Sequence, residues 1–378
     1  MGTQTIFDYV VIGAGISGAS VAYELSLKKQ SVLIIEMEEF PGFHATGRSA
    51  AFFAETYGNH TVRCLTKASR DFFENAPKNF CENELFKARG ALFIARDDQL
   101  EKLNQFYMEV SKLSDKVVQE DAAFALRKVG KLIPETIAGC VWDPDSQEID
   151  VAALHQGYLK LAKQNGAELK LNAAVTELIN SENHWQIKTK DKIFSAKVIV
   201  NAAGAWADKV AQMAAVKPVG LVPKKRTVAV VPIEKSIDVN DWPLVVDIDE
   251  EFYFKPEGGN LLLSPADETP VEPMDAYTEM MDVAVAVERV TAVLDIEIKQ
   301  VSHEWAGLRT FVEDKSPVIG FDSENSSFFW LAGQGGYGIQ MAPACAKLAA
   351  SLMLGEKPSE SLLAFGFEIS TVLPQRIK

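Results

Sequence analysis

One glycine-rich turn near the N-terminus constrains the fold of this chain more than any other feature. A short apolar run, Tyr9 to Ile12, ends in Gly13-Ala-Gly15-Ile-Ser-Gly18, and an apolar segment with helical spacing follows. A second apolar run then ends at Glu36. The first glycine permits the tight turn, the second lets the backbone approach a pyrophosphate, and the third lets helix and strand pack closely. The pattern predicts a parallel βαβ unit that binds a dinucleotide.

The same unit predicts how the dinucleotide is held. We expect Ile16 and Ser17 at the start of the helix, where unpaired N–H groups and the helix dipole favour phosphate. Glu36 lies 18 residues after Gly18, close to where an acid accepts a hydrogen bond from a ribose hydroxyl. On this motif alone, FAD and NAD both remain possible.

Three later segments of small residues favour FAD. The segment from Pro41 to Ala51 carries small and hydroxylated residues with one arginine, which suits a chain lying against pyrophosphate and a flavin ring. The run Asn-Ala-Ala-Gly at 201–204 ends a predicted strand, where small residues let the backbone come close to a cofactor. A second glycine-rich turn at 333–338 precedes a helix whose dipole can stabilise a reduced flavin. An NAD-dependent dehydrogenase would lack this second glycine-rich turn near the C-terminus.

Together these segments resemble the D-amino acid oxidase-like family of FAD-dependent oxidoreductases, which includes glycine and sarcosine oxidases. The likeness runs from Tyr9 to Leu354 and is strongest to the bacterial D-arginine dehydrogenases within the family. It is carried by Gly47-Arg-Ser-Ala-Ala, Leu154-His-Gln-Gly-Tyr, Asn201-Ala-Ala-Gly-Ala-Trp, Trp305-Ala-Gly-Leu-Arg and Gly335-Gly-Tyr-Gly-Ile-Gln.

The resemblance implies a set of FAD contacts beyond the first turn. They are Arg48, Ser49, Ala50, Ala51, Val175, Ala203, Gly204, Trp206, Gly333, Gly335, Gly336, Tyr337, Gly338, Ile339 and Gln340. Covalent members of the family hold the flavin through a cysteine near the last glycine-rich turn. None of the four cysteines here falls in that turn, so we expect FAD to be bound non-covalently.

The expected architecture is an α/β, Rossmann-like FAD-binding domain of the glutathione-reductase type with an inserted α+β substrate domain. Alternating apolar runs separated by Pro and Gly between residues 218 and 301 predict an antiparallel sheet in the insertion. We assign 1–85, 141–215 and 310–378 to the FAD-binding domain, and 86–140 and 216–309 to the substrate domain. The predicted helices are 19–27, 61–73, 98–113, 151–164, 282–294 and 343–354.

The resemblance also implies a site that binds an amino-acid carboxylate. Arg309 matches the family's carboxylate-binding arginine, whose planar guanidinium can donate two parallel hydrogen bonds. Arg226 and Tyr253 match further substrate-contacting positions, Tyr57 matches a lid tyrosine, and Gly336 is expected beside them. Taken alone, Arg226 could belong to a solvated charge run and Tyr253 to the core.

Three positions depart from the D-arginine dehydrogenase pattern. Phe52 stands where those enzymes have a histidine, Ala91 where they have an acid that faces a basic substrate, and Ala54 where they have a threonine. A cationic side chain left unpaired in a partly desolvated pocket costs several kcal/mol by rough estimate. We therefore expect the pocket to prefer neutral or apolar side chains.

The predicted reaction is oxidative deamination of a D-amino acid. Hydride passes from Cα to the flavin, and the resulting imino acid is hydrolysed to a 2-oxo acid and ammonia. No catalytic triad is needed, so the five histidines are expected to be structural or exposed. Oxygen, a quinone or a dye remain possible electron acceptors. Oxidation of glycine, N-methyl or cyclic imino acids is the main alternative, and a non-catalytic FAD-binding subunit is a weaker one.

Composition sets the remaining limits. A formal net charge of −14 over 378 residues disfavours nucleic acid and anionic lipid surfaces as partners. The scattered cysteines contain no CxxC pair, so we expect neither a disulfide framework nor a metal site. The N-terminal residues lack the pattern of a signal peptide, and no apolar run is long enough to span a membrane. These features predict a cytoplasmic protein.

Overall fold

The computed structural model describes residues 5–181 and 184–377 and contains two large β-sheets. Residues 1–4, 182–183 and 378 of the predicted FAD-binding domain lie outside the described residues. The first sheet has the order β10-β11-β12-β1-β2-β9, and β19 joins β12 and pairs with β18. Its strands are β1 (Ile6–Ile12), β2 (Val32–Ile35), β9 (Glu168–Lys170), β10 (Val175–Ser181), β11 (His184–Thr189), β12 (Ile193–Asn201), β18 (Val318–Phe321) and β19 (Phe328–Ala332).

The centre of this sheet is parallel and buried on both faces. β1 pairs in parallel with β2 and β12, so that Ile12 lies beside both Ile35 and Asn201. Val11 packs into the core under the helices of one face, and Val10 packs into the core on the other face. Short apolar runs of β-branched residues form such strands because both of their faces are covered.

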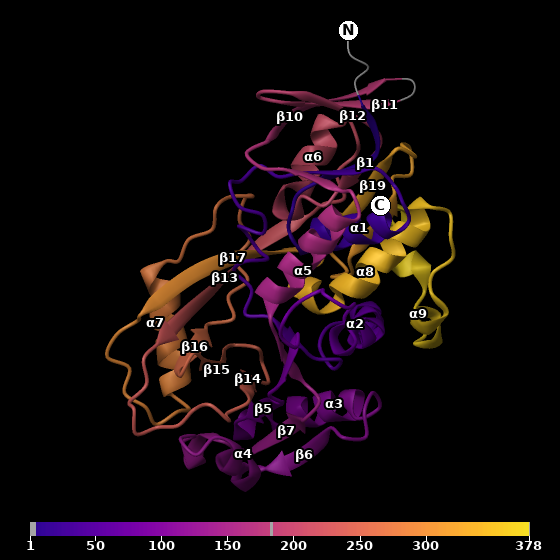
Figure 1. The fold of residues 1–378 in the computed structure, drawn as a ribbon. Helices are drawn as coiled ribbons and strands as arrows, with labels where there is room; N and C mark the ends of the chain where they lie inside the picture. Colours follow the sequence, from indigo (N-terminus) through magenta and orange to yellow (C-terminus); the bar gives the residue numbers. More distant parts are fainter. Residues whose placement is uncertain (1–4, 182–183, 378) are drawn as a thin grey trace.

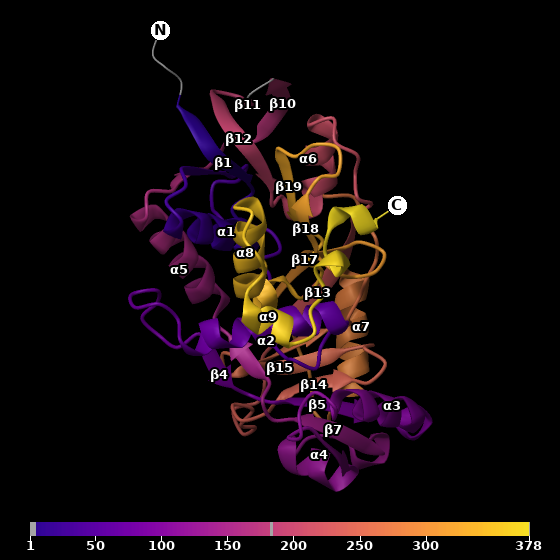
Figure 2. The ribbon, with the colours of Figure 1, turned by 90° about the vertical axis from the view of Figure 1, so that its right-hand side faces the viewer.

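Helices cover this sheet on both sides. α1 packs against α5 and α8, and α2 packs against α8, while α6 contacts β10 and β12 (Figures 1 and 2). Among the residues that the structure describes, the α-helices are α1 (Ile16–Leu27), α2 (His60–Glu74), α3 (Leu100–Val110), α4 (Ala122–Lys128), α5 (Val151–Gln164), α6 (Ala207–Met213), α7 (Met280–Thr291), α8 (Gly338–Met353) and α9 (Glu360–Ala364).

The second sheet has the order β17-β13-β16-β15-β14-β5-β7-β6 and is antiparallel except between β14 and β5. α7 packs against β13 and β16, and α3 and α4 pack against β7 at the far end of the molecule (Figure 1). The strands are β5 (Ala91–Ala95), β6 (Val118–Asp121), β7 (Gly139–Asp143), β13 (Val222–Val231), β14 (Leu244–Asp247), β15 (Tyr253–Glu257), β16 (Asn260–Ser264) and β17 (His303–Phe311). A small third sheet joins β3 (Phe52–Phe53), β8 (Gln147–Ile149) and β4 (Phe86–Ala88).

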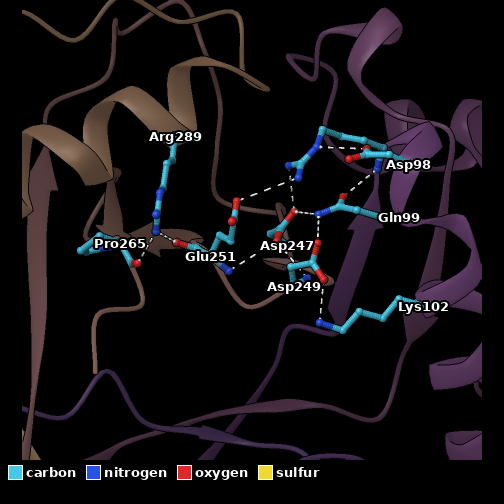
Figure 3. A network of polar contacts seen from close by, with 9 residues as sticks. Asp98, Gln99, Lys102, Asp247, Asp249, Glu251, Pro265 and Arg289 are labelled. Atoms are coloured by element: carbon cyan, nitrogen blue, oxygen red, sulfur yellow. Dashed lines mark hydrogen bonds and ion pairs between the residues drawn. The ribbon is translucent and has the colours of Figure 1, made fainter. Parts of the chain in front are cut away.

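The turn between β14 and β15 is held by a network of polar contacts (Figure 3). The Asp247 carboxylate is 1% exposed and accepts hydrogen bonds from Gln99 at 3.1 Å and Arg96 at 3.3 Å. The Asp249 backbone N–H also donates to Asp247, at 2.9 Å. Arg289 of α7 donates to two backbone carbonyls beside the same turn. These bonds fix the end of β15 that enters the substrate-side wall described below.

The predicted fold class is confirmed, and most predicted elements lie within a few residues of the observed ones. Three details differ. α8 begins at Gly338, five residues before Pro343, where we expected it to start. The strand β17 was not predicted. The predicted domain boundaries between 140 and 141 and between 309 and 310 cut through β7 and β17, which both belong to the second sheet. The division into domains otherwise stays a prediction.

Candidate cofactor and substrate site

One cavity is lined by residues of both large sheets and by the glycine-rich turns. Most of the predicted FAD contacts lie in its wall. They are Gly13, Gly15, Ile16, Ser17, Glu36, Arg48, Ser49, Ala50, Val175, Ala203, Gly204, Trp206, Gly333, Gly335, Gly336, Gly338 and Ile339.

The first glycine turn has the geometry that its sequence predicts. Gly13 has a φ of +104°, and a Cβ there would lie 2.5 Å from the Ala202 carbonyl oxygen. Gly18 does not line the cavity, and a Cβ on it would lie 1.9 Å from the Gly13 carbonyl oxygen. Gly15 is the residue before α1 and lines the cavity. The backbone therefore brings the start of α1 to the cavity, where a helix N-terminus favours a phosphate.

Two side chains define the cavity around this turn. Glu36, at the end of β2, is 8% exposed and accepts a hydrogen bond from the Ala14 N–H at 2.7 Å. Thr46 accepts a hydrogen bond from the Ile16 N–H at 2.9 Å. Thr46 was not among the predicted contacts, although it lies in the segment of small residues that favoured FAD.

Gln334 gives the strongest indication that a polar ligand belongs in this cavity. Its side-chain Oε1 accepts a hydrogen bond from the Ser17 hydroxyl at 2.9 Å. Its Nε2 is buried and has no hydrogen-bond partner among the described residues. Because a buried amide donor is costly without an acceptor, a ligand oxygen or ring nitrogen fits here. This donor, the glycine cradle and Glu36 together fit FAD.

Four predicted cofactor contacts do not line the cavity: Gly18, Ala51, Tyr337 and Gln340. Gln340 instead ties α8 to its neighbours, because it accepts from the Ala54 N–H at 3.1 Å and donates to the Thr66 hydroxyl at 2.9 Å. Arg48 does line the cavity, but its guanidinium donates to the Ala276 and Ala306 carbonyl oxygens. It also pairs with Asp275. The charge of Arg48 is therefore already bound by protein groups.

The substrate-side wall comes from the face that β13 and β17 share. In their antiparallel register Arg226 lies opposite Gly307, and Lys224 lies opposite Arg309. Side chains opposite each other lie on the same face, as do residues two apart along a strand. The two arginines therefore point to one side of the sheet. Both line the cavity, together with Tyr253 of β15.

Arg309 is surrounded by tyrosines. Burial lowers the pKa of Arg309, but the neighbouring Tyr57 and Tyr253 raise it, and the net shift is upward. The Tyr57 ring lies 4.9 Å from that of Tyr337. A Cβ on Gly336 would come within 2.9 Å of the Arg309 Cζ, so the glycine makes room for the guanidinium. Within the described residues, Arg309 forms no ion pair with an acid.

Arg226 differs from Arg309 because protein groups already balance its charge. Its Nε donates to the Asp267 carbonyl oxygen at 2.9 Å, and its terminal nitrogen lies 3.4 Å from Glu268. Lys224 also pairs with Glu268, at 2.9 Å. Burial raises the pKa of Glu268, but Lys224 and Arg226 lower it, and its pKa lies below its ordinary value.

The three predicted side-chain pocket residues, Phe52, Ala54 and Ala91, do not line the cavity. Phe52 pairs with β8 in the small sheet, and Ala91 is fully buried between β14 and β7. Tyr57 does not line the cavity either, although it contacts Arg309. The structure thus brings together Arg309, Arg226, Tyr253 and Gly336, and the pocket role of the other positions stays a prediction.

Comparison with known proteins decides the family. Residues 8–352 match the sequence profile of the family described as FAD dependent oxidoreductase (DAO). The chain belongs to this family. It is an FAD-dependent oxidoreductase with FAD as its cofactor, as the cavity indicates. The predicted family resemblance is confirmed, and the narrower likeness to D-arginine dehydrogenases stays a prediction.

Two curated relatives match most of the chain. Glycerol 3-phosphate dehydrogenase of Caloramator mitchellensis is 25% identical over 364 residues, which cover 90% of this chain and 72% of that protein. Glycine oxidase of Geobacillus kaustophilus is 23% identical over 373 residues, which cover 95% and 96%. Its crystal structure superposes with a TM-score of 0.84 at 20% identity, covering 97% of this chain and 99% of the other.

A crystal structure of L-proline dehydrogenase from P. horikoshii superposes with a TM-score of 0.82 at 22% identity, covering 99% of this chain and 98% of the other. These structures share the fold of this chain. In the part of the chain that the structure describes, no helix is long and apolar enough to cross a membrane, and no cluster of acidic, histidine or cysteine side chains could hold a metal ion.

Proposed function

We propose that this protein oxidises the Cα–N bond of D-amino acids with neutral or apolar side chains. The observation that carries the proposal is Arg309, a half-buried cation in the cavity wall that has no acid partner within the described residues. Removing a cation from water without a counter-charge is costly, so an anionic ligand group fits beside it. A carboxylate also matches the two parallel donors of a guanidinium.

The surrounding charges favour a ligand with one carboxylate. Arg226 and Lys224 both pair with Glu268, and the Asp267 carboxyl also interacts with Arg226, so these two cations and two acids leave no net charge for a second anion. A phosphate ester carries close to two negative charges and would need more than Arg309. The Caloramator relative is named a glycerol 3-phosphate dehydrogenase. The charge balance here supports an amino acid over such a substrate.

The chemistry follows from holding the carboxylate in one place. FAD, when bound, supplies the two-electron acceptor for this oxidation. Arg309 binds the carboxylate, and the hydroxyl of Tyr57 holds the guanidinium in position. With the carboxylate fixed, the Cα–H bond keeps one orientation in the complex. The entropic cost of orienting the substrate is then met on binding and not in the oxidation step. The substrate loses a hydride from Cα, its nitrogen lone pair forms the imine, and water then releases ammonia and a 2-oxo acid.

The preference for D-amino acids with neutral side chains rests on the sequence resemblance alone, because Phe52 and Ala91, the departures that suggested it, do not line the cavity. A second candidate is oxidation of glycine or of N-methyl or cyclic imino acids. The match to a protein named glycine oxidase over 95% of the chain favours including it. Both candidates use the same arginine, and they differ in what surrounds Cα and the nitrogen.

A substrate panel tests the proposal. Turnover is measured with D- and L-amino acids, glycine, sarcosine, D- and L-proline and glycerol 3-phosphate, with a dye and separately with oxygen as electron acceptor. We expect D-alanine or D-methionine to exceed D-arginine, L-amino acids and glycerol 3-phosphate in kcat/KM. Turnover of glycerol 3-phosphate without turnover of any amine would refute the proposed substrate class.

A further inference from the structure

Tyr57 belongs to the short segment between β3 and α2. Its side chain contacts Arg309, and its ring packs edge-on against Tyr337. We propose that Thr56 and Asp143 form a positioning pair that holds Tyr57 against the carboxylate-binding arginine. The inference rests on the proposed function in one respect, because it takes Arg309 as the site of a substrate carboxylate.

The contact between the two residues is buried and short. The Thr56 hydroxyl donates to the Asp143 Oδ2 at 3.0 Å, and the two residues are 3% and 4% exposed. The same oxygen accepts from the Ser146 hydroxyl at 2.9 Å, and Oδ1 accepts from the Asp145 backbone N–H at 3.1 Å. A hydrogen bond to an ionised acceptor is stronger than a neutral one, and exclusion of water strengthens it further. Asp143 therefore fixes Thr56 to the end of β7.

The backbone of the segment is held on both sides of Thr56. The Ala54 N–H donates to the Gln340 side chain at 3.1 Å, and the Tyr57 N–H donates to the Ala54 carbonyl oxygen at 3.2 Å. Asn59 then caps α2. The main chain is anchored before and after Thr56, and the Thr56 side chain adds the hydrogen bond that joins the turn carrying Tyr57 to β7 of the second sheet. Tyr57 is thus carried by a fixed turn.

Asp143 has a second conceivable role as an acid for a basic substrate. It lies opposite Ala91 across β5 and β7, so the two side chains share a face of the sheet. Ala91 is the position where the family resemblance places such an acid. The Asp143 carboxylate is almost fully buried, however, and both of its oxygens accept hydrogen bonds from neighbouring protein groups. These contacts favour positioning of Tyr57 over binding of substrate.

A double-mutant cycle between Thr56→Val and Tyr57→Phe tests the inference on the FAD-loaded enzyme. Valine keeps the shape of threonine and removes its hydroxyl, and phenylalanine removes the hydroxyl that Thr56 is proposed to position. We expect Thr56→Val alone to lower kcat/KM about fivefold, mainly through KM, and to cost less than about twofold in the Tyr57→Phe background. Thr56→Ser, which keeps the hydroxyl, should restore activity. The positioning role would be overturned if kcat/KM of the double variant fell by the product of the two single-variant factors. It would also be overturned if Thr56→Val had unchanged kinetics.

Acetate binding gives a readout that does not depend on turnover. Its affinity, followed by the absorbance of bound FAD, should show the same non-additive pattern in the cycle. If no amino acid is oxidised, the proposed function fails, and the acetate cycle still decides the role of Thr56. Asp143→Asn should weaken acetate as Thr56→Val does, whereas Asp145→Asn, at a surface carboxylate paired with Lys116, should not. If Asp143→Asn lowered kcat/KM only for D-arginine and D-lysine, Asp143 would be a substrate-binding acid and the proposal would be overturned.

Discussion

Replacing Arg309 by lysine keeps the positive charge at the cavity and removes the planar pair of donors. In the structure the guanidinium fills the space that Gly336 leaves open and is held by tyrosines rather than by an acid. A lysine ammonium can make one good hydrogen bond to a carboxylate where the guanidinium makes two. A hydrogen bond to a charged group contributes about 1.5–3 kcal/mol. At about 1.4 kcal/mol per factor of ten, kcat/KM should fall roughly 10- to 100-fold.

The assay compares kcat/KM of the wild type and of Arg309→Lys for the best substrate of the panel, together with the FAD content of each protein. FAD content should not change, because the carboxylate site is separate from the glycine turn that holds the dinucleotide. Arg63→Lys is a matched control, since Arg63 pairs with Glu109 and does not line the cavity. If Arg309→Lys has normal kinetics, Arg309 is a structural residue and the carboxylate clamp is wrong.

Three further predictions each concern a single residue. Gly336→Ala puts a Cβ 2.9 Å from the Arg309 Cζ, so it should lower kcat/KM of the FAD-loaded enzyme about tenfold, and unchanged kinetics would argue against the clamp. Asp247→Asn removes a buried charge from the network of Figure 3 and should lower the thermal unfolding midpoint by the equivalent of about 2 kcal/mol, whereas Asp98→Asn, at an exposed carboxylate, should not. Burial raises the pKa of Glu24 to about 7 in the folded protein, above its value in the unfolded chain. The free energy of unfolding is therefore highest below the unfolded pKa, where Glu24 is protonated in both states, and it falls as pH rises through about 7. Glu24→Gln should therefore raise the unfolding midpoint at about pH 8 and leave it unchanged at about pH 4, and equal gains at both values would contradict the burial of a charge.

The cofactor half of the molecule could be predicted well because its signals are local. The tight turn at Gly13, the close packing at Gly18 and the acid at Glu36 lie within one βαβ unit, and backbone sterics leave few alternatives for such a spacing. Buried strands and amphipathic helices such as α2 were also evident from their periodicity.

The substrate half was harder because its contacts join distant parts of the chain. β17 was not predicted as a strand, since the residues on its cavity face include Gly307 and Arg309 rather than apolar side chains. The pairing of Arg226 with Glu268 and of Thr56 with Asp143 depends on how loops meet after the sheets have formed. Sequence spacing carries no signal for such long-range pairs.

Reduction of bound FAD in the absence of oxygen tests most directly whether an amino-acid carboxylate is held at Arg309. D-alanine and D-alanine amide share the same Cα–H and amine, and the amide lacks the carboxylate. We expect D-alanine to bleach the FAD absorbance at least about tenfold faster than the amide at equal concentration, and Arg309→Lys to reduce this difference. Equal bleaching by the two compounds would contradict the carboxylate clamp. Bleaching by glycerol 3-phosphate and by no amino acid would contradict the proposed reaction itself.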